Sequence, residues 1–135
     1  MEAAEARRLF GTAAVARLAS VRPDGAPHLV PVCFAVDGDT VYTAVDAKPK
    51  RTQRLARLRH IAAEPRVALL ADHYEDDWTR LWWVRADGRA RIVHDAAERD
   101  RALELLAGRY SQYRNAPPAG PVVAVDVGCW SGWRA

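Results

Sequence analysis

The chain has 135 residues, of which 50% are hydrophobic and 27% are charged. This composition is ordinary for a soluble globular protein and excludes the disordered and membrane-spanning classes. The length predicts a single domain over residues 1–135, large enough to bury a core. The formal net charge is only +3. Because the cations are clustered, this charge favours a small anionic ligand and does not indicate a nucleic-acid partner.

The first ten residues carry acidic before basic side chains and no apolar run, so they do not resemble a secretory signal. We therefore expect a cytoplasmic protein without a membrane partner. Cys33 and Cys129 lie in apolar, strand-like segments. This context favours two buried free thiols over a structural disulfide.

Periodicity and turn residues in the first half predict a helix followed by a meander of three strands. Arg22-Pro23-Asp24-Gly25 is a strong turn signal and closes the first hairpin. Pro31 lies within the second strand and cannot donate a ladder hydrogen bond, which indicates an edge strand, a bulge or a ligand contact. The predicted ranges are 2–10 for the helix and 14–21, 27–36 and 40–45 for the strands.

A second helix ends near Glu64-Pro65, with Arg57 and Arg59 on its polar faces. Its apolar face consists of residues at spacings of three and four, namely Leu55, Leu58, Ile61 and Ala62.

The remaining segments predict three strands, a helix and a final strand. Residues 66–74 read as a buried strand, in which Leu70 is one of the apolar residues, and Asp87-Gly88 predicts a hairpin between strands 80–85 and 89–94. Asp95 and Glu98 have the form of a capping box at the start of the third helix, and a β-branched run over 122–127 closes the chain. Antiparallel meanders with helices that fill the gaps predict an α+β fold, a small closed or split β-barrel.

The densest charge lies between Asp46 and Ile61, where six cations precede and enter the second helix: Lys48, Lys50, Arg51, Arg54, Arg57 and Arg59. Cations at a helix N-terminus have the wrong sign for the helix dipole. Free backbone N–H groups, the dipole and these side chains could together hold a phosphate or a carboxylate. A solvated basic face is the alternative.

Five tryptophans are many for a chain of this length. Trp82 and Trp83 are adjacent on a strand and must point to opposite faces of the sheet. One is expected in the core, and the other indicates a partner subunit or a planar ligand.

The sequence gives little indication of a metal site or of catalytic side chains. The acidic run Asp72–Asp77 is consecutive rather than convergent, so we expect an acidic turn and no metal site. The histidines are scattered and the chain has no phosphate-binding motif of the Rossmann or Walker type. We therefore assign no catalytic residue. A redox cofactor would explain an anion site without an acid, base or nucleophile.

Two long segments carry a resemblance to a known family: VARLASVRPDGAPHLVPVCFAVDGDTVYT and DAKPKRTQRLARLRHIAAEPRVALLADHYEDDWTRLWWVRADGRARIV. Together they resemble the pyridoxamine 5'-phosphate oxidase-like split-barrel proteins, and among them the branch that uses the deazaflavin coenzyme F-420. This resemblance implies a mainly antiparallel split β-barrel with short flanking helices. It also implies a homodimer with the cofactor in a groove at the interface.

The resemblance further implies a set of cofactor-binding residues. The phosphate end would meet Lys48, Lys50, Arg51 and Thr52, with Arg57 also on the cofactor. The backbone of Val30, Pro31 and Val32 would lie along the ring system, and the partner chain would supply Trp82, Trp83 and Arg85.

The implied activity is that of an F-420-dependent oxidoreductase that transfers a hydride between the deazaflavin and an unsaturated small molecule. Two alternatives stay open. One is an FMN-dependent oxidoreductase, and the other is a non-catalytic carrier of a deazaflavin, a fatty acid or a haem.

Overall fold

The computed structural model describes residues 1–44 and 51–135, and the side chains of these residues except those of 51–56. None of its helices within these ranges combines the length and the apolar character that a membrane crossing needs. The elements are α1 (Ala3–Thr12), β1 (Ala16–Val21), β2 (Pro27–Val32), β3 (Ala35–Asp37), β4 (Thr40–Ala44), α2 (Arg51–Ala63), β5 (Arg66–His73), the short 3-10 helix η1 (Trp78–Arg80), β6 (Trp82–Ile92), α3 (Ala96–Arg109), α4 (Ser111–Asn115) and β7 (Val122–Arg134).

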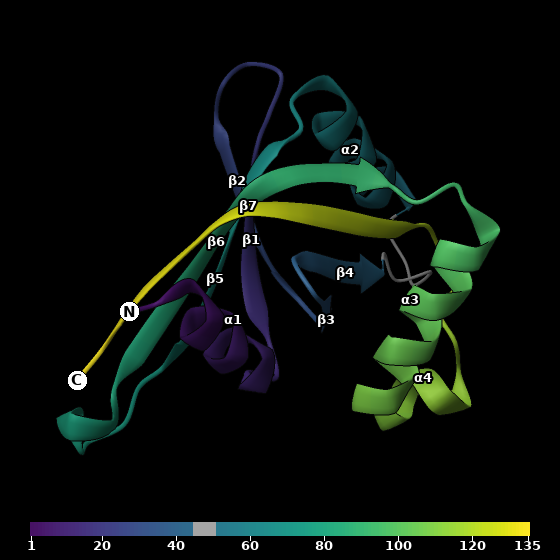
Figure 1. Ribbon diagram of the computed structural model, residues 1–135. Helices are drawn as coiled ribbons and strands as arrows, with labels where there is room; N and C mark the ends of the chain where they lie inside the picture. The colour runs from purple at the N-terminus through teal and green to yellow at the C-terminus, as the bar shows by residue number, and fades with distance from the viewer. Residues whose placement is uncertain (45–50) are drawn as a thin grey trace.

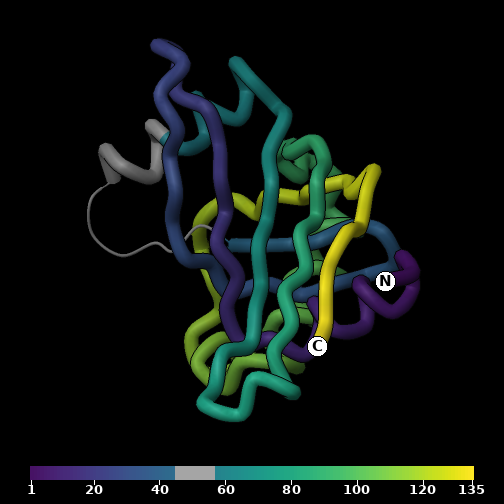
Figure 2. The backbone as a smooth tube through the Cα atoms, turned by 90° about the vertical axis from the view of Figure 1, so that its left-hand side faces the viewer, coloured from purple at the N-terminus to yellow at the C-terminus, as the bar shows by residue number. Residues whose placement is uncertain are grey.

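The strands form one curled antiparallel sheet in the order β2-β1-β5-β6-β7-β4-β3. Figure 2 shows the long strands side by side, and Figure 1 shows β7 and β6 bending together over the top of β4. Helices α3 and α4 stand at one end of the sheet beside β4, whereas α1 packs near the middle. A mainly antiparallel sheet with short flanking helices agrees with the predicted α+β class.

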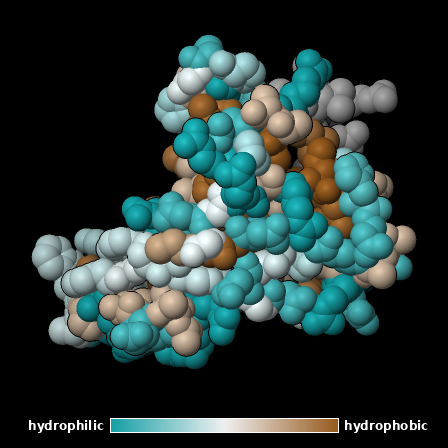
Figure 3. All heavy atoms as spheres, turned by 45° about the horizontal axis from the view of Figure 1, so that its top comes forward, coloured by the Kyte–Doolittle hydropathy of each residue, from teal (hydrophilic) through white to brown (hydrophobic). Residues whose placement is uncertain are grey.

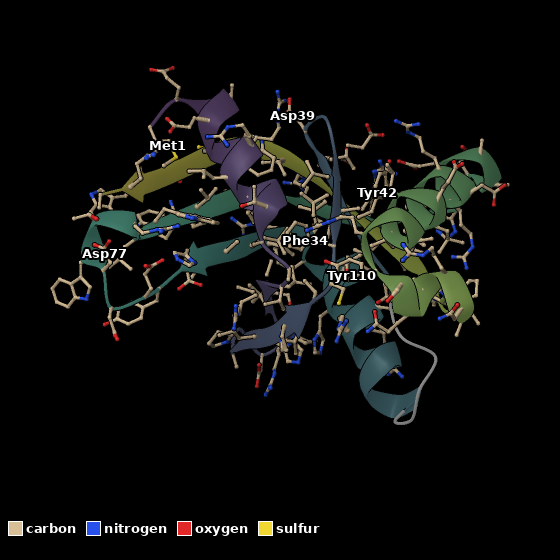
Figure 4. The ribbon with its side chains drawn as sticks, turned by 90° about the horizontal axis from the view of Figure 1, so that it is seen from below. Met1, Phe34, Asp39, Tyr42, Asp77 and Tyr110 are labelled. Atoms are coloured by element: carbon tan, nitrogen blue, oxygen red, sulfur yellow. The ribbon has the colours of Figure 1, made fainter. Side chains whose placement is uncertain are left out.

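The predicted meander of three strands is wrong, because the run 27–36 splits in two. β2 and β3 lie at opposite edges of the sheet. Between them, Phe34 is fully buried, and its backbone N–H donates to the Tyr110 hydroxyl at 3.1 Å. Its carbonyl accepts from the Arg109 guanidinium at 2.5 Å. Side chains from α3 and its C-terminal cap thus replace strand partners at this crossing, and Figure 4 shows Phe34 and Tyr110 together near the centre of the molecule.

The predicted hairpin at Asp87-Gly88 is also wrong. β6 runs straight through this dipeptide and pairs with β5 on one side and β7 on the other, with a register shift between Asp87 and Gly88. A Cβ atom on Gly88 would lie 2.4 Å from the Asp126 carbonyl oxygen. Glycine therefore permits a close backbone approach at a bulge, a role that Gly in a strand often has. The reversal between β5 and β6 lies at the predicted acidic turn, which continues into η1, where the Asp77 side chain accepts from the Thr79 N–H at 3.1 Å.

The main core lies between the inner face of the sheet and helices α1 and α2. Phe10 of α1 packs against Phe34, with ring centroids 4.7 Å apart, and against Trp130 of β7, with centroids 5.4 Å apart. Ile61 joins this core from α2, as predicted, whereas Ala62 is exposed. Figure 3 shows mainly hydrophilic atoms on the face that it presents, with the apolar areas concentrated in its upper half.

Polar residues at the start of helix α3 cap the helix and bind it to the sheet. The Asp95 side chain accepts from the Glu98 N–H at 3.0 Å, which confirms the predicted N-cap. The Glu98 carboxylate accepts from the Tyr42 hydroxyl at 2.8 Å and from the Arg91 guanidinium at 2.7 and 2.8 Å. Arg91 also donates to Asp126 at 2.7 Å. One polar network therefore joins α3 to β4, β6 and β7.

The last strand is longer than predicted, because β7 includes the whole aromatic tail. Trp130 packs against the core, and its indole N–H donates to Asp39 at 3.0 Å. Cys129 is exposed and Cys33 is half-buried, and both are free thiols. The expectation of two buried thiols is therefore wrong for Cys129.

Candidate functional site

A groove of about 610 Å³ crosses the outer face of the sheet, opposite to the face on which α1 and α2 pack. Four strands line it, namely β2, β1, β5 and β6. Its lining residues are Arg17, Ala19, Leu29, Ala68, Leu69, Leu70, Asp72, Trp83 and Arg85. The volume lies within the ~300–1,000 Å³ that is usual for sites of small ligands.

Strand alternation explains why this face is apolar. On β5 the side chains of Val67, Leu69 and Ala71 enter the core, so Leu70 between them points outward and is 41% exposed. Leu70 was predicted to be buried, and the structure corrects that prediction. Leu29 of β2 is 67% exposed on the same face. Contiguous exposed apolar side chains are uncommon on a protein surface, and they often mark a site that binds a ligand or another protein.

The two adjacent tryptophans separate as predicted. Trp82 packs against the main core, whereas Trp83 lines the groove and is 38% exposed. Trp83 lies directly opposite Trp133 of β7 in the strand register, so the two indoles share one face. The aromatic surface therefore continues beyond the groove onto β7.

Charged side chains stand among the apolar ones. Arg85 donates to Asp87, two residues along the same strand, at 2.9 Å. Arg17 of β1 and Asp72 of β5 also line the groove. The site thus offers an apolar floor, an aromatic ring and guanidinium groups, which suits a planar ligand that carries polar or anionic edges.

The three predicted contacts of the ring system lie on an edge strand. Among the described strands β2 pairs with β1 alone, and Pro31 is opposite Arg17 in that register. The edge position is one of the three explanations offered for Pro31, and it is confirmed. Pro31 is exposed, whereas Val30 packs against the core and Val32 is buried.

The predicted phosphate end falls largely outside the described residues. Lys48 and Lys50 lie outside them, and so do the side chains of Arg51 and Thr52, whose backbone begins α2. Arg57 is described. It is half-buried rather than on a polar face, and burial lowers its pKa.

The sequence did not reveal that two histidines lie close to Arg57. The imidazole rings of His28 on β2 and His60 on α2 lie edge to face with centroids 5.6 Å apart. Burial lowers the pKa of His28, and the positive charges of Arg22, His60 and Arg57 lower it further. The spacing of Arg57 and His60, three residues apart on a helix, was the only signal in the sequence. The proximity of His28 was not visible there, because it depends on how α2 packs on the β1–β2 hairpin.

Metal binding has no support in the described part of the chain, which contains no group of three or more His, Cys, Asp or Glu side chains placed to hold an ion. In the acidic turn, His73 pairs with Glu75, and Arg80 lies 3.5 Å from the same carboxylate. The groove itself offers one carboxylate, Asp72, and no nucleophilic side chain. Its residues can bind and orient a reactive molecule but do not form a nucleophile–base pair.

Residues 3–134 match the family model described as pyridoxamine 5'-phosphate oxidase. The match therefore covers almost the whole chain. A search of curated proteins finds no match.

Solved structures with the same fold come from several bacteria. A conserved hypothetical protein from Mycobacterium tuberculosis is 22% identical with a TM-score of 0.80, over 99% of this chain and 85% of that one. A FAD-binding protein from Mesorhizobium loti is 22% identical with a TM-score of 0.74, over 98% and 94% of the two chains. A heme storage protein from Vibrio cholerae is 14% identical with a TM-score of 0.70, over 97% and 90%. At these identities the likeness establishes the fold, and the predicted split barrel is confirmed.

Proposed function

Because the chain belongs to the pyridoxamine 5'-phosphate oxidase family, we propose that it is an oxidoreductase that holds a flavin-type cofactor in the outer groove. The observation that carries this proposal is the groove itself, an apolar strip with Trp83 on its floor and Arg17 and Arg85 among its lining. A tricyclic ring needs a flat apolar surface, and a nucleotide-like side chain needs cations. The residues that are present fit both needs.

The sequence resemblance and the solved structures favour different cofactors. The resemblance of the sequence favours the deazaflavin F-420. The protein from Mesorhizobium loti with the same fold is described as FAD-binding, which favours a flavin, and the FMN-dependent alternative is compatible with it. We retain F-420 and a flavin as the two candidates, and a binding experiment separates them.

In either case the cofactor would supply the redox chemistry, by accepting or donating a hydride at its ring. The chain's own residues would bind the cofactor and orient it. Trp83 and Leu70 would exclude water from one face of the ring, and Arg17 and Arg85 would hold its polar edge. Lys48, Lys50, Arg51 and Thr52, with Arg57, remain the proposed residues for the phosphate end. Arg57 lies with α2 on the other face of the sheet, so the cofactor would have to pass around the β2 edge to reach it. The substrate would be a small unsaturated molecule.

We infer that the working unit is a homodimer joined through the outer face. Leu29, Leu70, Trp83 and Trp133 are all exposed there, and a contiguous apolar surface is unfavourable in water. A second copy would cover this face and close the groove. Its Trp83 or Arg85 would then meet the cofactor of the first copy, whereas Trp82 packs against the main core and faces away from the groove.

Titration of the cofactor-free protein tests the cofactor. FMN, FAD and F-420 are added separately, and binding is measured by calorimetry and by the absorption of the ring. We expect Trp83→Leu to weaken binding of the preferred cofactor about two- to tenfold, in line with ~0.5–1.5 kcal/mol for a lost aromatic contact. Trp78→Leu is the matched control, because Trp78 is 67% exposed at the η1 turn and outside the groove. If none of the three cofactors binds, the proposal fails.

Sedimentation of the loaded and unloaded protein tests the dimer. Leu70→Glu places a charge on the apolar face and should yield a monomer that binds the cofactor weakly. Glu104→Lys is the control, because Glu104 is exposed on α3, away from the apolar face. A wild-type protein that sediments as a monomer with cofactor bound would rule out the shared groove.

A non-catalytic carrier is the second candidate. Two observations favour it: the described groove residues contain no nucleophile–base pair, and the fold is shared with a heme storage protein. Reduced cofactor on the protein is mixed with quinones, enones and tetrapyrroles, and its oxidation is followed. Oxidation no faster than that of free cofactor with every acceptor would favour the carrier over the enzyme.

A further inference from the structure

Charged side chains on the outer face of β5 and β6 are separated by sign along the strands. Leu69 and Ala71 of β5 enter the core, so the residues of even number on this strand point outward. Arg66 lies at the end of this outward row that is nearer to the β1–β2 hairpin loop, and Asp72 lies at the other end. Arg89 of β6 is directly opposite Arg66 in the register. We call Arg66 and Arg89 the basic end of the outer face.

The other end of the same two strands is acidic. β5 and β6 extend there beyond β1 and are joined through η1, at the opposite end of the long strands from the β1–β2 hairpin loop (Figure 1). We call residues 72–80 the arm tip. Its charged side chains are four carboxylates and one guanidinium, namely Asp72, Glu75, Asp76, Asp77 and Arg80. Arg80 lies 3.5 Å from Glu75, so the arm tip keeps a surplus of negative charge.

The basic end keeps a surplus of positive charge. Hydrogen bonds from Arg66, and to a smaller extent the charge of Arg89, lower the pKa of Glu64. One carboxylate therefore serves two guanidinium groups there. Asp126 of β7 is opposite Arg89 in the register, but it accepts from Arg91 at 2.7 Å. The charge of Asp126 is thus already shared with another arginine.

The two charged ends are too far apart to neutralise each other. Arg66 and Asp72 are separated by six residues of one strand, which is about 20 Å at ~3.3 Å per residue. The Debye length is only ~8 Å at physiological ionic strength. Between the two ends lies the apolar strip of the groove, with Leu70 and Trp83. The outer face therefore presents a positive patch, an apolar centre and a negative patch in sequence along its strands.

This order of charges selects among the ways in which two copies can face each other. A two-fold axis parallel to the strands would place arm tip against arm tip and basic end against basic end, so that like charges repel. An axis across the strands, in the plane between the two sheets, reverses the strand direction and places each arm tip against the basic end of the other copy. Packed sheets keep their strands within about 30° of each other in either case.

We propose that two copies pack outer face to outer face with their strands antiparallel, so that the arm tip of each copy contacts Arg66 and Arg89 of the other. The proposal rests on the homodimer proposed above and adds its orientation and the residues that hold its two ends. Asp72 both lines the groove and begins the arm tip. Each groove is therefore bordered by a contact between the two copies.

Charge reversal at the two ends is the first test. The dissociation constant of the dimer is measured by sedimentation at low and at high salt. Asp76→Lys and Arg89→Glu alter exposed side chains, and each change acts on two symmetry-related contacts. Each should weaken the dimer about two- to thirtyfold at low salt, which corresponds to ~0.4–2 kcal/mol, and less at high salt. The double variant restores opposite charges across the interface and should return toward the affinity of the wild type.

Matched controls separate the contact from the change in net charge. Glu104→Lys and Arg8→Glu make the same two changes of charge at exposed positions of α3 and α1, and neither should alter the dimer. A dimer with its strands parallel predicts the opposite sign for the arm tip, because Asp76→Lys would then relieve repulsion between two acidic tips. A stronger dimer in Asp76→Lys, or effects no larger than those of the controls, would overturn the proposal.

Cross-linking tests the orientation directly. Cys129 is an exposed thiol, so Cys129→Ser is the background. Asp76→Cys and Arg89→Cys are made singly and together and are treated with a bis-maleimide, and covalent dimers are counted on a denaturing gel. The double variant should cross-link far more than either single variant. Cross-linking of Asp76→Cys alone to the same extent as the double variant would place the two arm tips together and refute the antiparallel arrangement.

Failure of the proposed function gives a different pattern of results. If FMN, FAD and F-420 all fail to bind while the charge variants behave as expected, the cofactor is refuted and the orientation stands. If Leu70→Glu disrupts the dimer and the charge variants do not, the dimer through the outer face stands and the orientation is refuted. A wild-type protein that is monomeric refutes both.

Discussion

The polar network at the start of α3 gives the stability of this protein a specific dependence on pH. The Arg91 guanidinium, and then the Tyr42 hydroxyl, lower the pKa of Glu98 from 4.5 to about 2. Burial and the same Glu98 raise the pKa of Tyr42 to about 12, so this hydroxyl remains a donor at neutral pH. A carboxyl whose pKa is lowered by folding stabilises the folded state above its unfolded pKa. This contribution is lost as the pH falls toward the folded value.

The size of the effect follows from the shift. At about 1.4 kcal/mol for each pKa unit, the shift sets an upper limit of roughly 3 kcal/mol. The Glu98 side chain is 23% exposed and that of Arg91 is 42% exposed, so solvent screening reduces the expected value to about 1–2 kcal/mol. For a chain of this length, that corresponds to roughly 4–7 °C in the melting temperature.

Urea unfolding of the wild type and of Glu98→Gln, followed by circular dichroism from neutral pH down to pH ~2, measures this contribution. The variant should be less stable at neutral pH, and the difference should vanish as the pH approaches 2. Glu104→Gln is the control, because Glu104 is exposed on the same helix and makes no such network. The same difference between wild type and Glu98→Gln at every pH would refute the linkage argument.

Three further substitutions test other parts of the fold by the same unfolding measurement. Gly88→Ala should destabilise the protein by about 2 kcal/mol or more, since its Cβ would meet the Asp126 carbonyl oxygen at 2.4 Å; wild-type stability would mean that the β6–β7 bulge adapts freely. Phe10→Ala should cost ~3–5 kcal/mol, because it removes a fully buried ring that packs on two other aromatic rings. Asp95→Ala should cost ~1 kcal/mol through the lost N-cap of α3, and no change would show that the helix is held by its side-chain network alone.

Local signals in the sequence identified most of the elements, and they failed where long-range contacts decide. The N-cap at Asp95 is read within four residues and is confirmed. Asp87-Gly88 has the composition of a hairpin turn, but both of its edges are occupied by β5 and β7, so the chain continues straight. The break at Phe34 depends on Tyr110, which is 76 residues away in the sequence. No local pattern contains that information.

The candidate site was predictable to the extent that strand alternation determines it. The separation of Trp82 and Trp83 follows from the two-residue period and is confirmed. The cluster of Ser20, His28, Arg57 and His60 beneath α2 was not predictable, because it needs the pairing of Ser20 with His28 and the packing of α2 over both. Two histidines that are distant in the sequence become neighbours only after the helix docks on the sheet.

The same alternation separates stability from binding on the two faces of one sheet. On β6, Val84 and Ala86 enter the core, while Trp83 and Arg85 face the groove. The outward residues contribute little to the core, so the large apolar groups among them mark a candidate binding surface. On the inward side of the β1–β2 hairpin the opposite is found, because polar atoms are enclosed there beneath α2. An apolar group left outside and a polar group left inside are both costly, and the cost on the outer face would fall if the proposed cofactor ring and second copy covered it.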